Sequence, residues 1–194
     1  MEDRKIDEVE SLELITLMIK NARTNLRARI NCNILLGWGY TVVSISLFVC
    51  FFKVYKIFVY SSFLWLLIPV IGFSIAKYFS SKDKASVKSY LDKTIDYISV
   101  LFAIVCSVLG LLAIWIDFPI LFIEGVLFSM WIIIIGILIK YKPVIYGGIV
   151  GLVISFCVLL VRGEVCSIFV FAFIPVFSLI IPGHIFKKSL SENV

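Results

Sequence analysis

The stretch LIKYKPVIYGGIVG, residues 138–151, decides how this chain folds, because it places three glycines, two lysines and a proline between two apolar segments. A phosphate-binding loop needs a strand before its glycines and a lysine after them, whereas here the lysines come first. Pro143 suits the first turn of a helix. Gly147 and Gly151 lie four residues apart, so they share a helix face that a neighbouring backbone can approach closely. We therefore predict a turn at 140–143, followed by a helix that packs through its glycines.

The rest of the sequence has the composition of a membrane protein. Of its 194 residues, 61% are hydrophobic and only 16% are charged, and its mean hydropathy is +1.09. Long apolar runs are typical of membrane spans, and about 20 helical residues cross the hydrocarbon core. We therefore predict an all-α integral membrane protein with six transmembrane helices in residues 32–186. The apolar runs that would form them are 33–52, 57–79, 95–116, 119–139, 143–161 and 165–182.

The lysines and arginines predict the orientation. One side of the bundle would carry thirteen of them, in residues 20–29, 77–93, 140–142 and 187–188, and the other side would carry three. Cytoplasmic loops hold the positive excess. We therefore predict a multi-pass protein of the bacterial inner (cytoplasmic) membrane, with both termini and the tail 187–194 in the cytoplasm. The net charge of +5 does not indicate a nucleic-acid partner, because the basic residues are scattered over short loops.

Residues 1–31 predict an amphipathic helix in the cytoplasm or at the membrane interface. Between residues 6 and 30, apolar side chains recur three or four positions apart and form one stripe. The bases in the second half of this helix abut the membrane, where anionic lipid would attract them. They are Lys20, Arg23, Arg27 and Arg29. The same helix could instead dock a cytoplasmic protein, so the lipid bilayer and a protein partner both remain open.

Two acidic residues are candidates for binding a ligand or an ion. Glu124 lies in the fourth apolar run, and an acid at membrane depth is costly and often functional. Asp96 lies near the start of the third helix, where a carboxylate is favoured. Both have structural alternatives. Glu124 could reach the outer surface or bond to a hydroxyl group, and Asp96 could belong to a surface charge ladder with Lys88 and Asp92.

Signatures of enzymes and metal sites are absent from the sequence. It holds no HExxH, GxSxG or Walker motif, and its single histidine, His184, has no cysteine near it in the sequence. We therefore expect no catalytic activity, no metal and no cofactor. The five cysteines fit small buried hydrophobic residues. Cys50 and Cys166 are the one pair that placement near the outer face would allow to form a disulfide.

The second, fourth and sixth apolar runs end alike. Each has a glycine four or five residues before a lysine, and these glycines are Gly72, Gly136 and Gly183. Three hairpins of the same orientation, related by an axis along the membrane normal, would give this pattern. The preference for positive charge on the cytoplasmic side would by itself put a lysine at each inner helix end, so the repeat is a hypothesis.

Five segments spread over nearly the whole chain carry a family resemblance. They are ESLELITLMIKNA at 10–22, LLGWGYTVV at 35–43, VKSYLDKTIDYI at 87–98, GILIKYKPVIYGGI at 136–149 and LIIPGHIFKK at 179–188. In this order they resemble a family of small, uncharacterised, six-helix inner-membrane proteins of Bacteroidetes-type bacteria. Members of that family often look like neighbours of a winged-helix transcription regulator, so the resemblance implies a sensory or regulatory role. It implies no catalytic residues.

The sequence thus favours a non-enzymatic integral inner-membrane protein with a regulatory or sensory role, exerted through a cytoplasmic partner. The alternative is a small-molecule or ion transporter or channel with a cavity near Glu124. Gly147 and Gly151 would pack helices either within the chain or across a homo-oligomer, and the sequence leaves this open.

Overall fold

The computed structural model describes residues 12–14, 16–18, 32–57, 61–82 and 90–191. Throughout these ranges the regular structure is helical, and they contain no strand. The elements are α2 (Cys32–Tyr55), the 3-10 helix η1 (Ser61–Leu66), α3 (Leu67–Lys82), α4 (Tyr90–Leu112), α5 (Ile120–Leu138), α6 (Lys142–Leu160), α7 (Glu164–Pro175), the π-helix η2 (Val176–Ile180) and α8 (Ile181–Ser191). The prediction of an all-α fold is confirmed.

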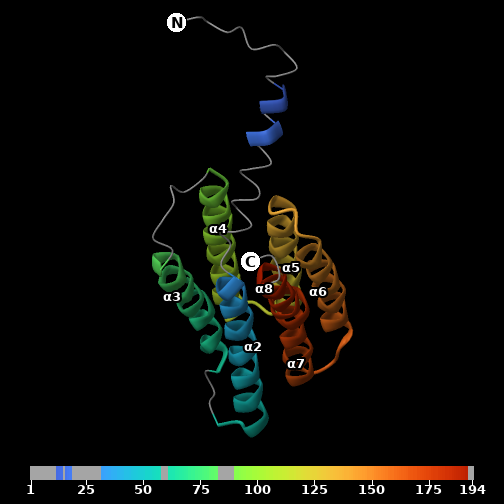
Figure 1. Cartoon of the computed structure of the whole chain (residues 1–194). Helices are drawn as coiled ribbons and strands as arrows, with labels where there is room; N and C mark the ends of the chain where they lie inside the picture. The colour runs from blue at the N-terminus through green and yellow to red at the C-terminus, as the bar shows by residue number, and fades with distance from the viewer. Residues whose placement is uncertain (1–11, 15, 19–31, 58–60, 83–89, 192–194) are drawn as a thin grey trace, which may run out of the picture.

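Successive helices run antiparallel in one bundle (Figure 1). The starts of α2, α4 and α6 lie at the same end as the final turns of α3, α5 and α8, and we call this the inner end. The connections that follow α2, α4 and α6 lie at the opposite, outer end. α7, η2 and α8 form one continuous helical segment that returns the chain to the inner end. The predicted boundary between bundle and tail, at residue 187, falls inside α8.

Five helical segments are long and apolar enough to cross a membrane. They are Asn33–Tyr55, Lys93–Leu112, Ile120–Leu138, Lys142–Leu160 and Glu164–Lys188. The predicted span 57–79 differs, because its apolar helix, Phe63–Phe79, is shorter and begins within the 3-10 helix η1. The structure is therefore compatible with a multi-pass membrane protein, in which five of the predicted spans have the expected length.

Helix α6 packs against two neighbours through its glycines. Towards α5, a Cβ atom added to Gly148 would lie 2.6 Å from Ile133 Cγ1. Towards η2, a Cβ atom added to Gly147 would lie 2.7 Å from the Phe177 carbonyl oxygen. Gly151 is also buried between these neighbours. Both Gly147 and Gly151 thus lie inside the bundle of a single chain, with backbones close enough to exclude a larger side chain.

Two hydrophobic clusters hold the bundle together. The larger cluster joins α2, α5, α6, α7 and η2, and its most deeply buried members are Ile132, Ile139, Val144, Ile174 and Leu179. The smaller cluster lies closer to the outer end and consists of Ile45, Val49 and Ile168, with α2 and α7 packed against each other. Van der Waals contacts between these side chains hold the helices together, as is typical of helices that pack in an apolar environment.

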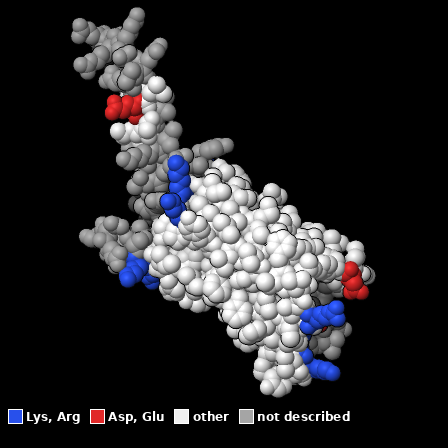
Figure 2. All heavy atoms as spheres, turned by 90° about the vertical axis from the view of Figure 1, so that its right-hand side faces the viewer, with Lys and Arg blue, Asp and Glu red and all other residues white. Residues whose placement is uncertain are grey.

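The outside of the bundle is also apolar. Only 6% of the most apolar part of α4 is buried, and Leu101, Ile104 and Val108 on this helix are exposed. On the face shown in Figure 2, the charged side chains of the described residues gather towards the two ends and leave a wide uncharged belt between them. Soluble monomers rarely expose so much contiguous apolar surface, so this belt fits the hydrocarbon core of a membrane.

The last span contains a π turn between two prolines. Pro175 and Pro182 flank η2, and each lacks the N–H group that an α-helix would use. The Ile181 N–H group bonds to the carbonyl of Val176, five residues back. The buried Ser178 hydroxyl donates to a carbonyl of α7 at 2.6 Å. The wider turn therefore keeps the helical segment continuous past both prolines.

The predicted N-terminal helix falls largely outside the described residues. Within 12–14 and 16–18 the chain is helical, and its side chains are exposed. The Thr16 hydroxyl donates to the Leu12 carbonyl at 2.8 Å. The four bases predicted to contact lipid or a partner, Lys20, Arg23, Arg27 and Arg29, lie outside the described residues.

The glycines that suggested a repeat do not occupy equivalent positions. Gly72 on α3 faces Trp38 within the first hairpin. Gly136 on α5 faces α6, which belongs to the next hairpin, and Gly183 on α8 faces Leu36 of α2. Three related hairpins would give the three glycines corresponding neighbours, so these contacts do not support the repeat hypothesis.

Candidate functional site

The outer ends of the helices surround a cavity of about 570 Å³, which we call the outer cavity. Its walls come from α2, η1, α4, α5, α6 and α7 and from the turns between them. Among the described residues, its charged lining consists of one base, Lys53, and three acids, Asp117, Glu124 and Glu164. The rest of the lining is mainly apolar. With all four groups charged, the lining is net negative, so the cavity favours a positively charged ligand.

Of the three acids that line the outer cavity, Glu124 lies farthest from the start of its helix. The connection 117–119 precedes α5, which begins at Ile120, and the Ile123 N–H group bonds to the Pro119 carbonyl at 3.2 Å. Glu124 therefore lies in the second turn of α5, about 6 Å along the axis from the first residue of the helix. Its side chain is half-buried and lines the outer cavity.

No side chain that the structure describes forms a hydrogen bond or ion pair with the Glu124 carboxylate. Opposite it lies Gly110 on α4, where an added Cβ atom would be 3.6 Å from Glu124 Oε1. Cys106, one turn earlier on α4, lines the narrower cavity that also reaches Glu124. The small residues of α4 thus leave the carboxylate accessible from within the bundle. A buried or half-buried carboxylate is normally paired, so this one has its bonding capacity available for a ligand.

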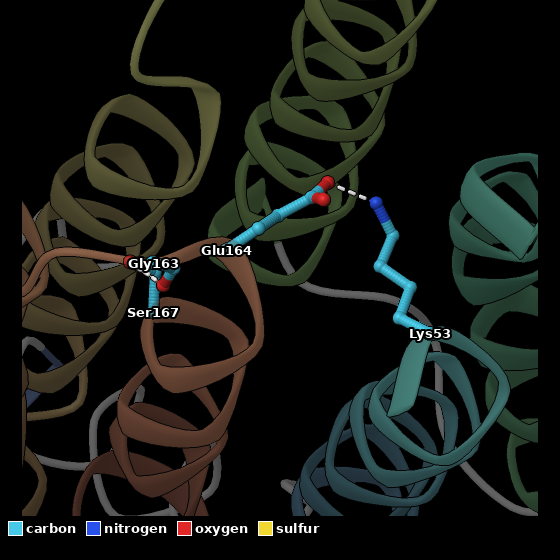
Figure 3. A network of polar contacts seen from close by, with 4 residues as sticks. All are labelled: Lys53, Gly163, Glu164 and Ser167. Atoms are coloured by element: carbon cyan, nitrogen blue, oxygen red, sulfur yellow. Dashed lines mark hydrogen bonds and ion pairs between the residues drawn. The ribbon is translucent and has the colours of Figure 1, made fainter. Parts of the chain in front are cut away.

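An ion pair lies at the edge of the outer cavity. The Lys53 ammonium at the end of α2 donates to Glu164 Oε1 at the start of α7 (Figure 3). The Ser167 hydroxyl bonds to the Gly163 carbonyl at 3.0 Å and continues this polar edge. A negative charge in the first turn of α7 also complements the helix dipole. The positive charge of Lys53 is thereby offset by Glu164, and Glu124 and Asp117 keep the lining net negative.

A narrower cavity of about 80 Å³, which we call the aromatic pocket, adjoins the outer cavity. Its aromatic lining consists of Trp38, Trp65, Phe102, Phe128 and Phe171, contributed by α2, η1, α4, α5 and α7. Packing between the rings fixes their positions. The rings of Trp65 and Phe171 meet edge to face with centroids 5.4 Å apart, and Phe102 stacks on Trp131 at 5.3 Å.

The two acids that the sequence singled out lie at opposite ends of the bundle. Asp96 is in the second turn of α4, near the inner end, and is exposed. Fourteen residues, or about 21 Å of helix, separate it from Gly110 beside Glu124. Asp96 and Glu124 therefore cannot share one ligand, and only Glu124 lines a described cavity.

The remaining candidates for chemistry lie apart from the cavity. The Tyr40 hydroxyl and His184 Nε2 are 2.9 Å apart, in a hydrogen bond that joins α2 to α8. Cys50 and Cys166 are free, so the predicted pairing between them is not formed. The described part of the chain contains no group of three or more histidine, cysteine or acidic side chains that could hold a metal ion.

The sequence analysis missed the ion pair and the aromatic pocket. Lys53 and Glu164 are 111 residues apart, and nothing in the sequence says that α2 and α7 are neighbours. The tryptophans gave a weak signal, because their distribution over several spans also fits interfacial anchoring. Trp115, which is 87% exposed, has the placement of such an anchor, whereas Trp131 is buried.

In comparisons with known proteins, no family model, no curated protein and no solved structure matches the chain.

Proposed function

We propose that this protein is a multi-pass membrane protein whose outer cavity binds a small positively charged ligand at Glu124, as a transporter or receptor for that ligand. The observation that carries the proposal is the Glu124 carboxylate, which lies half-buried in a cavity of about 570 Å³ without a described protein partner. Ionisable groups at membrane depth are expensive and commonly mark ligand or ion sites. The net negative lining would attract a cation and repel an anion.

The proposal includes six crossings of a bacterial inner membrane with both termini in the cytoplasm. Thirteen of the lysines and arginines would lie on the cytoplasmic side against three outside, as the positive-inside rule expects. The short helix Phe63–Phe79 supports a sixth crossing, because its 3-10 part rises faster per residue than an α-helix. Together its two parts span about 27 Å, close to the thickness of the hydrocarbon core.

In this orientation the outer cavity faces the periplasm. A cation would enter past the Lys53–Glu164 pair and meet Glu124 about 6 Å along α5. Transport would need a second arrangement of the helices that opens Glu124 to the inner end, and a receptor would need only the binding step. A regulatory role through a cytoplasmic partner of residues 1–31, and the family resemblance that implies it, stay predictions beside this proposal.

The test is cation binding by the full-length protein in nanodiscs. Tetramethylammonium is the probe, and saturation-transfer NMR reports its binding. We expect Glu124→Gln to weaken binding by about tenfold or more, because two opposite unit charges about 4 Å apart attract each other by about 1–4 kcal/mol between bulk water and a protein surface. Glu13→Gln is the matched control, since Glu13 is exposed in 12–14 and lines neither cavity.

The proposal fails if the wild-type protein binds no tetramethylammonium, or if both glutamine variants bind it equally well. Flux into proteoliposomes then separates the two roles. Uptake that depends on Glu124 identifies a transporter, and binding without uptake identifies a receptor.

A further inference from the structure

The outer cavity and the aromatic pocket meet at Glu124. Both cavities are lined by Trp65, Leu66, Gly110 and Glu124, so the two cavities adjoin at these residues and both reach the same carboxylate. A charged group bound at the carboxylate therefore has two different surroundings beside it. The wide outer cavity with its other acids lies on one side, and a narrow pocket lined by rings lies on the other.

The aromatic pocket has the chemistry that recognises an alkylated cation. Its lining includes five aromatic rings, and aromatic side chains attract a cation that has few hydrogen-bond donors of its own. The apolar edges of the rings and the small side chain of Ala103 favour alkyl groups through burial of apolar surface. Cys106 and Ser107 are weakly polar, and the Ser107 hydroxyl is already bonded to the Ala103 carbonyl at 2.7 Å. Apart from Glu124, no described charged residue lines this pocket.

A hydrated inorganic ion makes poor use of such a pocket. Hard cations require several oxygens at short distance, and among the described charged side chains of this pocket only the Glu124 carboxylate could replace the water that such an ion loses. An alkylammonium group loses much less on leaving water, and its apolar part gains from the rings. The volume of about 80 Å³ limits that apolar part to a few carbon atoms.

We infer that the ligand of the proposed function is an amphiphilic organic cation, with its charged group at Glu124 and a short apolar part in the aromatic pocket. This inference rests on the proposed function, because it names the chemical class of the cation bound at the same carboxylate. The ligand comes either from solution or from the amine headgroup of a lipid, and the two sources share this chemistry.

The experiment is a titration of the full-length protein in phosphatidylglycerol nanodiscs with tetramethylammonium and then with ethyl-, propyl-, butyl- and hexyltrimethylammonium. We expect the affinity to rise about threefold to fourfold per methylene, because burial of a CH₂ group is worth about 0.8 kcal/mol. The rise should stop after a few methylenes, when the pocket of about 80 Å³ is full. Empty nanodiscs give the background from partition into lipid.

Two variants separate the pocket from the carboxylate. Ser107→Leu places a larger side chain into the pocket from α4, the helix with the smallest buried share among the long spans. Phe102→Leu removes one ring and keeps an apolar side chain. It replaces Ser107→Leu in the titration if that variant does not fold. Each should flatten the rise along the series, measured as the ratio of the butyltrimethylammonium affinity to the tetramethylammonium affinity of the same variant. Glu124→Gln should instead weaken every member of the series.

The outcomes separate the inference from the proposed function. Binding of tetramethylammonium at Glu124 with a flat series overturns the inference and leaves the proposed function standing. A rising series that the pocket variants do not flatten also overturns it. Absence of any cation binding overturns the proposed function itself. Repeating the titration with phosphatidylethanolamine in the nanodisc identifies the source, because a weaker apparent affinity shows a competing lipid amine and an unchanged affinity indicates a soluble ligand.

Discussion

Lys53 and Glu164 form an ion pair that joins the last turn of α2 to the first turn of α7 at the edge of the outer cavity (Figure 3). The two side chains are unequal in exposure, since that of Lys53 is 18% exposed and that of Glu164 is 67% exposed. An ion pair with one solvated partner contributes little to stability. Its charges, however, face a cavity in which every other described ionisable group is acidic. The pair therefore matters more for the charge of the cavity than for the free energy of unfolding.

Replacing Lys53 with methionine should raise the affinity for tetramethylammonium. The variant keeps the apolar stem of the side chain and removes the one positive charge in the described lining. We expect a gain of about threefold to tenfold, from loss of repulsion across the cavity, and a change of less than about 1 kcal/mol in stability. Saturation-transfer NMR and thermal unfolding measure the two effects. Lys56→Met is the control, because Lys56 follows α2 and lies outside the lining. Equal gains from both variants would contradict a local effect.

Gly147→Ala should destabilise the bundle, whereas Gly110→Ala should not. A Cβ atom on Gly147 would lie 2.7 Å from a backbone oxygen of η2, but one on Gly110 would meet its nearest atom at an ordinary 3.6 Å. Overpacking of this kind costs about 1–3 kcal/mol. Thermal unfolding in detergent, followed by circular dichroism, should show a lower midpoint for Gly147→Ala only. Similar midpoints for the two variants would mean that α6 and η2 separate easily.

Gly110→Ala has a second expected effect, on ligand binding. Its methyl group would lie 3.6 Å from Glu124 Oε1, inside the space where a cation would sit. The affinity for tetramethylammonium should fall by about threefold to tenfold, the range expected when a methyl group replaces a ligand contact worth about 1 kcal/mol. The same NMR titration checks this. An affinity equal to that of the wild type would show that the cation does not bind on the side of Glu124 that faces α4.

Ser129→Ala should leave stability unchanged or raise it, and Ser155→Ala should lower it. Both hydroxyl groups are fully buried. The Ser155 hydroxyl donates to the Gly151 carbonyl at 2.8 Å, whereas the Ser129 hydroxyl has no partner among the described residues. Removing a satisfied hydrogen bond costs about 0.5–1.5 kcal/mol, and removing an unsatisfied polar group costs little. Chemical denaturation of the two variants side by side measures the difference. A larger loss for Ser129→Ala would point to a bound water or ligand at its hydroxyl.

Much of the fold could be predicted from the sequence, because hydrophobicity and turn residues act locally. The turn at 140–143 is an example, since Pro143 lies in the first turn of α6 as its fixed backbone angle favours. The predicted span 57–79 shows the limit, because η1 replaces its first turns and shortens its apolar helix. A 3-10 start depends on how the segment meets its neighbours, which hydropathy does not record.

The site could be predicted only in part. Glu124 stood out because an acid within an apolar run is rare and costly. Its distance from Asp96 and its position beside Gly110 depend on how α4 and α5 pair. The aromatic pocket depends on the rotation of five different helical elements about their axes. Neither relationship follows from the spacing of residues along one helix.

The π turn η2 gives the last span two halves that are out of phase. An α-helix turns by about 100° per residue, so the extra residue of a π turn rotates everything after it by that amount relative to everything before it. Downstream of the turn, Gly183 faces Leu36 and His184 bonds to Tyr40, both on α2. Upstream of the turn, Glu164 of α7 forms an ion pair with Lys53, which also lies on α2. With this change of phase, side chains from both halves of the last span contact α2, one half near each end of that helix. Deleting one residue between 176 and 180 would therefore preserve the contacts at one end of α2 and lose those at the other end.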